Sequence, residues 1–285
     1  MYAIVSDIHG NYPAFTAVLR DAKAQGAEQL LLLGDYTNCY PFQNEVVETL
    51  RCLSNVTAIR GNHEDYLIYI HATAPAKRTR KSFMPLYWSY NRHTPENYAF
   101  ITELPETAQL SDVCGTIHLA HEVQKFIPSP VLYLGPSAYA DLMHKKPFTF
   151  EEFLTRAYEW ILNSPNTINA LRALPMGVYL FGHSHIPLHI EFEGRLLINP
   201  GSCGFTSDFD TRAEYALLDR APLDGGGFTW RVTQRRVEYD MDKVIEAIHE
   251  SDFPEKLSEW HEVFLEQLLR GNDAFSRYVH GAGSR

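Results

Sequence analysis

The chain has 285 residues, of which 45% are hydrophobic and 21% are charged, and this balance excludes a disordered, collagen-like or coiled-coil chain. Its 35 acidic and 25 basic residues give a formal net charge of −10, which opposes long-range attraction to a phosphate backbone. We therefore expect no broad surface for polymeric nucleic acid, although a local positive site is compatible with this charge.

The cysteines and the first residues indicate a cellular compartment. Four cysteines, none of them in a CxxC pair, predict neither a zinc knuckle nor a dense disulfide framework. The first residues, MYAIVSDIHG, lack the charged and apolar regions of a signal peptide. No apolar run approaches the roughly 18 residues that a membrane-spanning helix needs. We expect a cytoplasmic protein without a membrane segment.

The first sixty residues alternate between buried strands and amphipathic helices. Short apolar runs predict strands over residues 2–6, 30–33 and 56–59. Helical spacing of apolar residues predicts one helix capped by Asn11 and a second helix over residues 46–53. A βαβαβ rhythm of this kind predicts a parallel sheet flanked by helices.

The later chain is more varied. We interpret residues 1–285 as one domain with a helical insertion at about 64–110, a long loop or insert at about 122–150 and closing helices at about 241–270. Thr149 and Glu152 form a capping box that predicts a helix start. Further strands are expected over residues 113–120, 178–181, 196–198, 215–218 and 230–237.

Polar side chains that can bind metals stand where the predicted strands end. They are Asp7 with His9, Asp35, Asn62 with His63, His121, and His183 with His185. Because sites in open α/β sheets form beyond the carboxyl ends of the strands, these groups can converge although they are far apart in the chain. His118 lies on the same strand as His121, but alternation places the two on opposite faces.

The donor set favours more than one metal ion. Seven candidate side chains, with His63 left aside, are too many for one tetrahedral zinc and suit two ions that share a bridging carboxylate such as Asp35. Nitrogen and oxygen ligands favour Mn, Fe, Zn, Co or Ni over a metal selected by thiolate. Two divalent ions against Asp7 and Asp35 would leave a positive pocket that attracts anions. Such a centre can acidify a bridging water and clamp phosphoryl oxygens.

These motifs, in this order, resemble those of the calcineurin-like metallophosphoesterases. The resemblance rests on five segments: Asp7-Ile8-His9, Gly34-Asp35, Gly61-Asn62-His63-Glu64, His121 and Gly182-His183-Ser184-His185. Residues 33–48, 88–105 and 199–202, with the tail from Arg236, resemble the bacterial phosphodiesterase branch. The family fold is an α/β, four-layer αββα sandwich of two mixed sheets, here with a helical insertion.

The resemblance also implies residue roles. Asp7, His9, Asp35 and His185 would hold one metal ion, and Asp35, Asn62, His121 and His183 would hold the other. His63 would approach the substrate and assist the leaving oxygen. The implied activity is hydrolysis of a small phosphodiester or phosphomonoester by a metal-bridging hydroxide, with two divalent transition-metal ions as cofactors and manganese as the first expectation.

Alternatives to this function remain open on sequence. Some related bacterial proteins act on nucleotides, so a dinucleoside polyphosphate hydrolase of the same fold is one alternative. A non-catalytic metal-binding interaction scaffold is another, although no ligand position is lost here. Residues 34–38 lack the second Asp and the Arg of protein Ser/Thr phosphatases, which argues against that activity.

Several neighbouring residues have two interpretations each. Arg60 either contacts substrate or pairs with a carboxylate, and Glu122 can orient His121. The four cations within residues 77–81 form either a solvated helix end or loop, or a phosphate-steering patch. The aromatic residues 87, 88 and 90 are expected in the core rather than on a base-stacking shelf.

Overall fold

The computed structural model describes residues 1–127 and 135–282. Within these residues the strands form two five-stranded sheets, with the orders β10-β9-β1-β2-β3 and β4-β5-β6-β8-β7. The strands of the first sheet are β1 (Tyr2–Val5), β2 (Gln29–Leu32), β3 (Val56–Ala58), β9 (Ala213–Pro222) and β10 (Phe228–Val237). Those of the second are β4 (Thr107–Asp112), β5 (Gly115–Ala120), β6 (Gly177–Leu180), β7 (Leu188–Phe192) and β8 (Arg195–Asn199).

Both sheets are mixed. In the first sheet β1, β2 and β3 are parallel, as the βαβαβ rhythm predicts, and β9 and β10 add antiparallel strands. In the second sheet β5, β6 and β8 are parallel, whereas β4 and β7 pair antiparallel at the two edges. The parallel strands of each sheet therefore bring their carboxyl ends to one edge, where the candidate residues follow.

Alternation along β1 shows how the layers stack. Ala3 and Val5 share a cluster with Phe15 of α1 (Tyr12–Ala24), and residues of α2 (Gln43–Cys52) complete it. Ile4 belongs instead to a cluster with Leu180 of β6, which lies between the two sheets. The two faces of β1 thus contact a helical layer and the second sheet respectively. Asn11 caps α1 by accepting a hydrogen bond from the Ala14 N–H at 3.1 Å.

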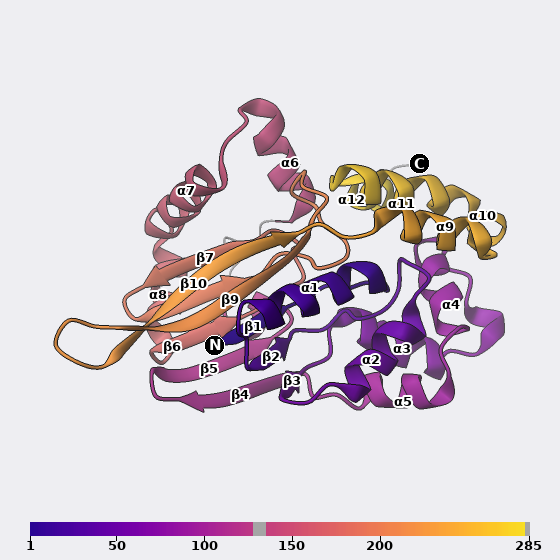
Figure 1. Ribbon diagram of the computed structural model, residues 1–285. Coiled ribbons are helices and arrows are strands. Elements are labelled where there is room, and N and C mark those ends of the chain that lie inside the picture. The colour runs from indigo at the N-terminus through magenta and orange to yellow at the C-terminus, as the bar shows by residue number, and fades with distance from the viewer. Residues whose placement is uncertain (128–134, 283–285) are drawn as a thin grey trace.

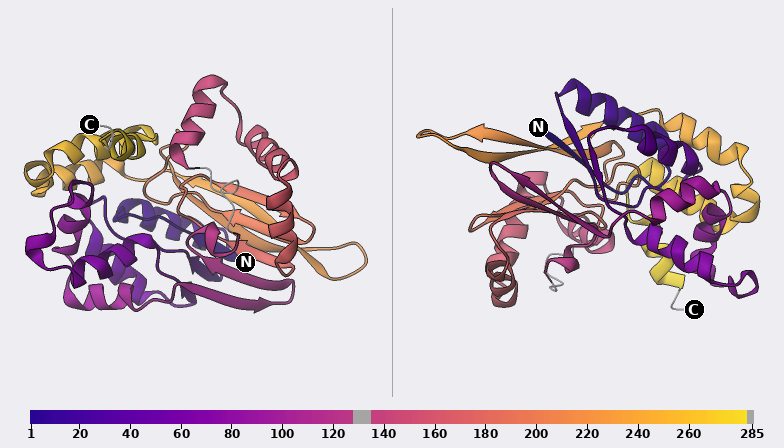
Figure 2. Two further views of the ribbon diagram at one scale, coloured as in Figure 1. Left: turned by 180° about the vertical axis from the view of Figure 1, so that it is seen from behind. Right: turned by 90° about the horizontal axis from the view of Figure 1, so that it is seen from below.

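A second helical layer covers the outer face of the other sheet. Tyr179 and Leu197 pack with Phe153 of α7 (Phe150–Leu162) and Leu171 of α8 (Pro165–Ala173). α7 begins at the predicted capping box, in which Thr149 Oγ1 accepts from the Glu152 N–H. Two helical layers around two mixed sheets confirm the predicted αββα sandwich (Figures 1 and 2).

Two groups of helices lie at one end of the sandwich (Figure 1). The insertion supplies α3 (Asn62–Ala72), α4 (Met84–Tyr90) and α5 (Pro95–Thr102), with short 3₁₀ turns η1 (Pro75–Lys77) and η2 (Lys81–Phe83). The C-terminal part supplies α9 (Met241–Glu250), α10 (Phe253–Lys256), α11 (Ser258–Arg270) and α12 (Ala274–Ala282). Trp88 Nε1 donates to Asp252 Oδ1 at 2.8 Å, which ties the two groups together.

The structure corrects two boundaries. The insertion expected to be mostly helical to about residue 110 already contains β4 from Thr107, and the single strand expected over 113–120 is the second half of a hairpin. Apolar residues on both sides hid the turn, in which Val113 is 79% exposed and Gly115 adopts φ +118°.

The segment expected as a loop or insert at about 122–150 contains the 3₁₀ turn η3 (Val123–Lys125) and a helix, α6 (Pro136–Lys145). The rest of that expectation, over residues 128–134, lies outside the described residues. The region expected to contain closing helices, about 241–270, holds α9, α10 and α11, with a break between α10 and α11 at Leu257. In the described ranges no helix is long and apolar enough to cross a membrane.

Candidate active site

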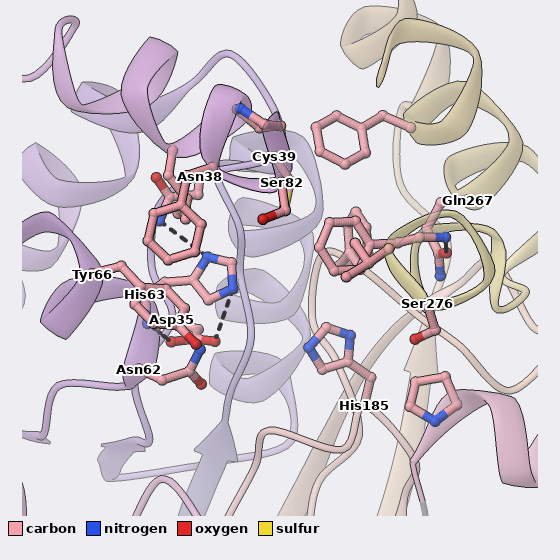
Figure 3. Close-up of a pocket in the computed structure, with 18 of the residues that line it drawn as sticks. Asp35, Asn38, Cys39, Asn62, His63, Tyr66, Ser82, His185, Gln267 and Ser276 are labelled. Atoms are coloured by element: carbon pink, nitrogen blue, oxygen red, sulfur yellow. Dashed lines mark hydrogen bonds and ion pairs between the residues drawn. The ribbon is translucent and has the colours of Figure 1, made fainter. Parts of the chain in front are cut away.

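The structure brings the seven candidate ligands together beyond the carboxyl ends of the strands. Asp7 and His9 follow β1, Asp35 follows β2, and Asn62 begins α3 just after β3. The other three histidines, His121, His183 and His185, follow β5 and β6. Figure 3 shows Asp35, Asn62 and His63 on one side of the resulting cavity and His185 on the other. The strand ends supply this convergence, as the sequence predicts.

Left-handed backbone is concentrated at these residues. The non-glycine positions with positive φ include Asp7 (+56°), His9 (+52°), Asp35 (+55°), His183 (+67°) and His185 (+56°). Residues other than glycine seldom adopt this backbone conformation, because it costs about 1 kcal/mol or more for each residue. Strain of this kind persists where surrounding contacts impose it, and it clusters at functional sites.

The donor atoms fall into two clusters. Those of Asp7, His9 and His185 lie within 4.8 Å of one another, as do those of Asp35, His121 and His183. His185 Nε2 is 3.2 Å from Asp7 Oδ1, and His121 Nε2 is 3.3 Å from Asp35 Oδ2.

The amide of Asn62 extends the second cluster. Its Oδ1 is 2.7 Å from His183 Nδ1 and 3.0 Å from His121 Nε2. An amide oxygen is an acceptor that can also serve as a ligand to a hard cation.

Electrostatics at the site depend on buried carboxylates facing imidazoles. Burial would raise the pKa of Asp7, but His185 and His121 hold it at about 2. Burial would lower the pKa of His121, but Asp35 and Asp7 raise it to about 10. Burial, with the charge of His121, lowers the pKa of His183 to about 4. Within the described residues, neither carboxylate is paired with lysine or arginine.

This donor set fits divalent metal ions. His9 Nε2 and His185 Nε2 face each other at 3.1 Å, although a single hydrogen at most can lie between them. His121 Nδ1 lies 2.7 Å from the Leu33 carbonyl oxygen, and a neutral His121 that donates there would have its Nε2 lone pair available to a cation, which would take the place of the proton beside Asp35. A histidine ligand is usually oriented in this way through its other nitrogen. The orienting partner is the Leu33 carbonyl, instead of the Glu122 carboxylate that the sequence suggested.

Glu64 holds the two loops that carry Asp35 and Asn62. Its buried carboxylate accepts hydrogen bonds from the N–H groups of Asp35 (2.8 Å), Tyr36 (3.0 Å) and Gly61 (2.8 Å). Burial and the Asp35 charge raise the pKa of Glu64 to about 7. The sequence marks Glu64 only as part of the Gly61-Asn62-His63-Glu64 segment and assigns it no role.

His63 lines the cavity beside Asp35. Its backbone N–H donates to Asp35 Oδ1 at 2.9 Å, and its Nε2 lies 3.8 Å from Asp35 Oδ2. Its Nδ1 lies 3.1 Å from the Asn38 amide nitrogen. Burial lowers the pKa of His63, which favours neutral imidazole. The sequence contained no signal for Asn38, because its position depends on a left-handed turn after Asp35.

Cys39 is a further residue that sequence reasoning missed. Its sulfur lies 3.7 Å from His9 Nδ1, and His9, Cys39 and His63 form a third group with metal-capable spacing. Burial raises the pKa of this thiol well above its usual range. No motif in the sequence marks Cys39 as a site residue, since it is separated from the other cysteines.

The turn over residues 199–202 forms hydrogen bonds to two of the loops that carry candidate ligands. Ser202 Oγ donates to the Asp7 carbonyl at 2.8 Å, and Asn199 Nδ2 donates to the Gly182 carbonyl at 2.9 Å. These bonds hold the loop after β1 and the loop after β6, so this turn has a structural role next to the ligands.

Two neighbouring side chains lie away from the reacting centre. Arg60 is paired with Asp65 and Glu106 at 2.7 Å each. Of its two interpretations, the structure therefore favours pairing with carboxylates over contact with substrate. His118 stacks on Tyr179 with ring centroids 4.7 Å apart, on the opposite side of the strand from the site, as alternation predicts. Tyr87 and Trp88 are buried, in agreement with their expected place in the core.

The site opens into a cavity of about 350 Å³ between the insertion and the C-terminal helices. Its floor includes Asp35, Asn62, His63, His183 and His185. From the basic segment 77–81, Arg80 lines the cavity, whereas Arg78 covers the ring of Tyr90 at 4.7 Å. Of these cations, Arg78 therefore has a structural role, and Arg80 lies at the site.

A comparison of the sequence with family models matches residues 2–187 to the calcineurin-like phosphoesterases. The chain belongs to this family. It is thus a metallophosphoesterase, a hydrolase of phosphate esters. The family uses divalent metal ions, and the structure holds groups of side chains that could bind them.

Relatives of this phosphoesterase include proteins from archaea and bacteria. The uncharacterized protein MJ0912 of Methanocaldococcus jannaschii is 27% identical over 274 residues, which cover 91% of this chain and 96% of that protein. Two crystal structures share the fold. A metallophosphoesterase from Sphaerobacter thermophilus matches with a TM-score of 0.61 and 22% identity over 95% of this chain and 98% of its own. The hypothetical protein PH1004 of Pyrococcus horikoshii OT3 matches with a TM-score of 0.63 and 20% identity over 95% and 99%.

Proposed function

We propose that this phosphoesterase holds two divalent metal ions and hydrolyses a small phosphodiester or phosphomonoester. One ion would be held by Asp7, His9, Asp35 and His185, and the other by Asp35, Asn62, His121 and His183. The observation that carries this proposal is the pair of donor clusters, Asp7–His9–His185 and Asp35–His121–His183, which are joined through Asp35 contacts to His9 and His121.

The chemistry of the donors suits several metals. Imidazole, carboxylate and amide oxygen select no single metal among Mn, Fe, Zn, Co and Ni, and we propose Mn first. When bound, such ions act as Lewis acids toward phosphoryl oxygens and lower the pKa of water.

The protein side chains position the ester and manage its protons. If the Asn38 amide donates to His63 Nδ1, the neutral imidazole carries its hydrogen on Nε2, which lies over the cavity floor. That N–H can donate a hydrogen bond to the oxygen that leaves phosphorus, and it stabilises the charge that develops there. His63 is therefore the proposed catalytic residue.

The first test is turnover of bis-p-nitrophenyl phosphate and p-nitrophenyl phosphate by protein loaded with Mn²⁺. Asp35→Asn removes a charge that contacts histidines of both clusters, and we expect activity to fall at least 1000-fold. His63→Ala should lower kcat by about 100-fold while two ions remain bound per chain, measured by elemental analysis. Glu246→Gln, at an exposed position on α9, is the matched control. Absence of turnover with every divalent metal, or full activity of Asp35→Asn, would overturn the proposal.

Hydrolysis of a dinucleoside polyphosphate is the second candidate within this class. The aromatic side chains around the cavity favour it over hydrolysis of a purely aliphatic ester. A panel of nucleotide and metabolite phosphates decides between them, and no preference for nucleotides would remove this candidate. Purified protein that contains no metal ion and binds none would instead support a non-catalytic scaffold.

A further inference from the structure

Much of the active-site cavity is lined by apolar side chains. The insertion supplies Phe83, which packs on Tyr66, and Leu86, whereas an apolar wall on the other side is formed by Phe205 from the loop after β8 and by Phe264, Phe275 and Val279 from the C-terminal helices. Phe205 connects this wall to the floor, because its ring lies 5.2 Å from that of His9 and 5.6 Å from that of His185. An apolar surface therefore begins directly beside the candidate metal ligands.

Contacts within the protein hold the aromatic rings of this wall in place. The ring of Phe205 meets Phe264 at 5.8 Å and Phe275 at 5.7 Å, both at an interplanar angle of 87°. Gln267 Nε2 donates to the Thr206 carbonyl and to Ser207 Oγ, which fixes α11 against the loop that carries Phe205.

Gln267 fixes the start of α12 as well. Its Oε1 accepts the Phe275 N–H at 3.2 Å, and its amide nitrogen lies beside the Asn272 carbonyl oxygen. In Figure 3, Gln267 and Ser276 lie across the cavity from His63 and Tyr66. Because contacts within the protein already hold these rings in place, the rings lose little conformational freedom when a ligand packs against them.

Packing between helices accounts for only part of the wall. Phe264 is fully buried and serves the core, but Phe275 and Val279 are partly exposed and line the cavity. On the opposite side Tyr66 is 36% exposed and its ring lies 5.8 Å from that of His63. The cavity volume of about 350 Å³ is in the range of sites for small molecules.

A single cation completes the lining. Arg80 is the sole lysine or arginine among the described residues that line the cavity. Its guanidinium lies over the ring of Phe83 at 4.2 Å, and its Nε donates to Ser82 Oγ at 2.8 Å. Within the described residues no carboxylate forms an ion pair with Arg80, so this cation of the cavity lining is available to an anionic ligand.

We propose that the cavity binds a phosphate ester in which the organic group that stays on phosphorus carries a planar aromatic ring. This inference rests on the proposed function and deepens it. The aromatic group packs between Phe275 and Val279 on one side and Tyr66 on the other, while the phosphoryl group lies over the histidine and carboxylate floor. Arg80 balances negative charge on the ester. A sugar phosphate or glycerol diester would leave the apolar wall in contact with water.

The test compares two diesters that share a leaving group. The p-nitrophenyl ester of thymidine 5′-phosphate and methyl p-nitrophenyl phosphate both release p-nitrophenolate when water adds to phosphorus. A difference in rate therefore reports the group that phosphorus retains. Stacking of a base on an aromatic side chain corresponds to about 5- to 150-fold, so wild-type kcat/KM should favour the thymidine ester by that factor.

Two variants with different effects on the cavity sharpen the test. Phe275→Ala removes a ring from the wall, and Ser276→Trp fills the space in front of it; both should reduce the preference for the thymidine ester toward 1. Phe228→Ala is the matched control, because it removes the same side chain from an exposed position, 53% exposed, on β10. Circular dichroism and bound metal should match the wild type in all three.

The outcomes separate this inference from the function on which it rests. If the wild type turns over both esters with equal kcat/KM, or if both cavity variants keep the full preference, the aromatic site is refuted while the phosphoesterase activity stands. If neither ester nor bis-p-nitrophenyl phosphate is hydrolysed with any divalent metal, the proposed function itself fails. If Phe275→Ala does not fold, Ser276→Trp alone decides the matter.

Discussion

Glu64 offers the sharpest prediction about what holds the site together. Replacement by Ala removes the acceptor for the three N–H groups of Asp35, Tyr36 and Gly61, which lie 2.8 to 3.0 Å from its oxygens. A buried donor left without a partner costs about 1 to 3 kcal/mol. With partial relaxation, we expect Glu64→Ala to lower the free energy of unfolding by about 3 to 5 kcal/mol, a large part of the usual 5 to 15 kcal/mol of a domain.

The effect on the site is distinct from the loss of stability. Because Glu64 holds the backbone of Asp35, Glu64→Ala should also reduce bound metal and kcat at a temperature where the variant is still folded. Glu64→Asp keeps a carboxylate and should lose less than Glu64→Gln, which directs an amide NH₂ toward N–H donors. Urea unfolding and elemental analysis measure the two effects, with the exposed Glu246→Ala as control. Unchanged unfolding and unchanged metal content in Glu64→Ala would refute this reasoning.

Three further predictions concern single side chains. Burial lowers the pKa of His93 from 6.5 to about 4, so the unfolded chain binds the proton more readily than the folded one. Acidification from pH 6.5 to 4 should therefore lower the free energy of unfolding by up to about 3 kcal/mol. His93→Gln should remove that part of the pH dependence, measured by urea unfolding. A Cβ at Gly182 would lie 1.9 Å from Ser6 Oγ and 2.6 Å from Asp7 Oδ2, so Gly182→Ala should displace Asp7 and at least halve bound metal; wild-type metal content would contradict this. Asn38→Ala should lower kcat by about 10-fold with metal content unchanged, whereas unaltered kcat would remove Asn38 from the positioning of His63.

The positions of the candidate ligands could be predicted because they depend on a simple rule of strand ends. Asp7 and Asp35 each follow a short apolar run, and parallel strands bring such positions to one edge. Alternation along β5 likewise separates His118 from His121. These inferences need only the strand pattern, which local hydrophobicity encodes well.

The supporting residues could not be predicted, because their roles depend on backbone geometry. Asn38 and Cys39 reach His63 and His9 only through consecutive left-handed residues after Asp35. For Arg60 the sequence left both substrate contact and pairing with a carboxylate open, and the structure pairs it with Asp65 and Glu106. Glu106, like the histidines beside Asn38 and Cys39, is far from its partner in the sequence and is brought to it by the tertiary fold.

The strained backbone explains why residues that touch no substrate belong to the functional unit. Five candidate ligands have left-handed φ values, and at about 1 kcal/mol each the total is comparable to the stability of a small domain. Hydrogen bonds from Ser202 to the Asp7 carbonyl and from the Asp35 N–H to Glu64 hold this conformation. Their loss would let the loops relax toward ordinary φ values and turn the ligand side chains away from one another. The geometry for metal binding is therefore maintained by the surrounding turns as much as by the ligands themselves.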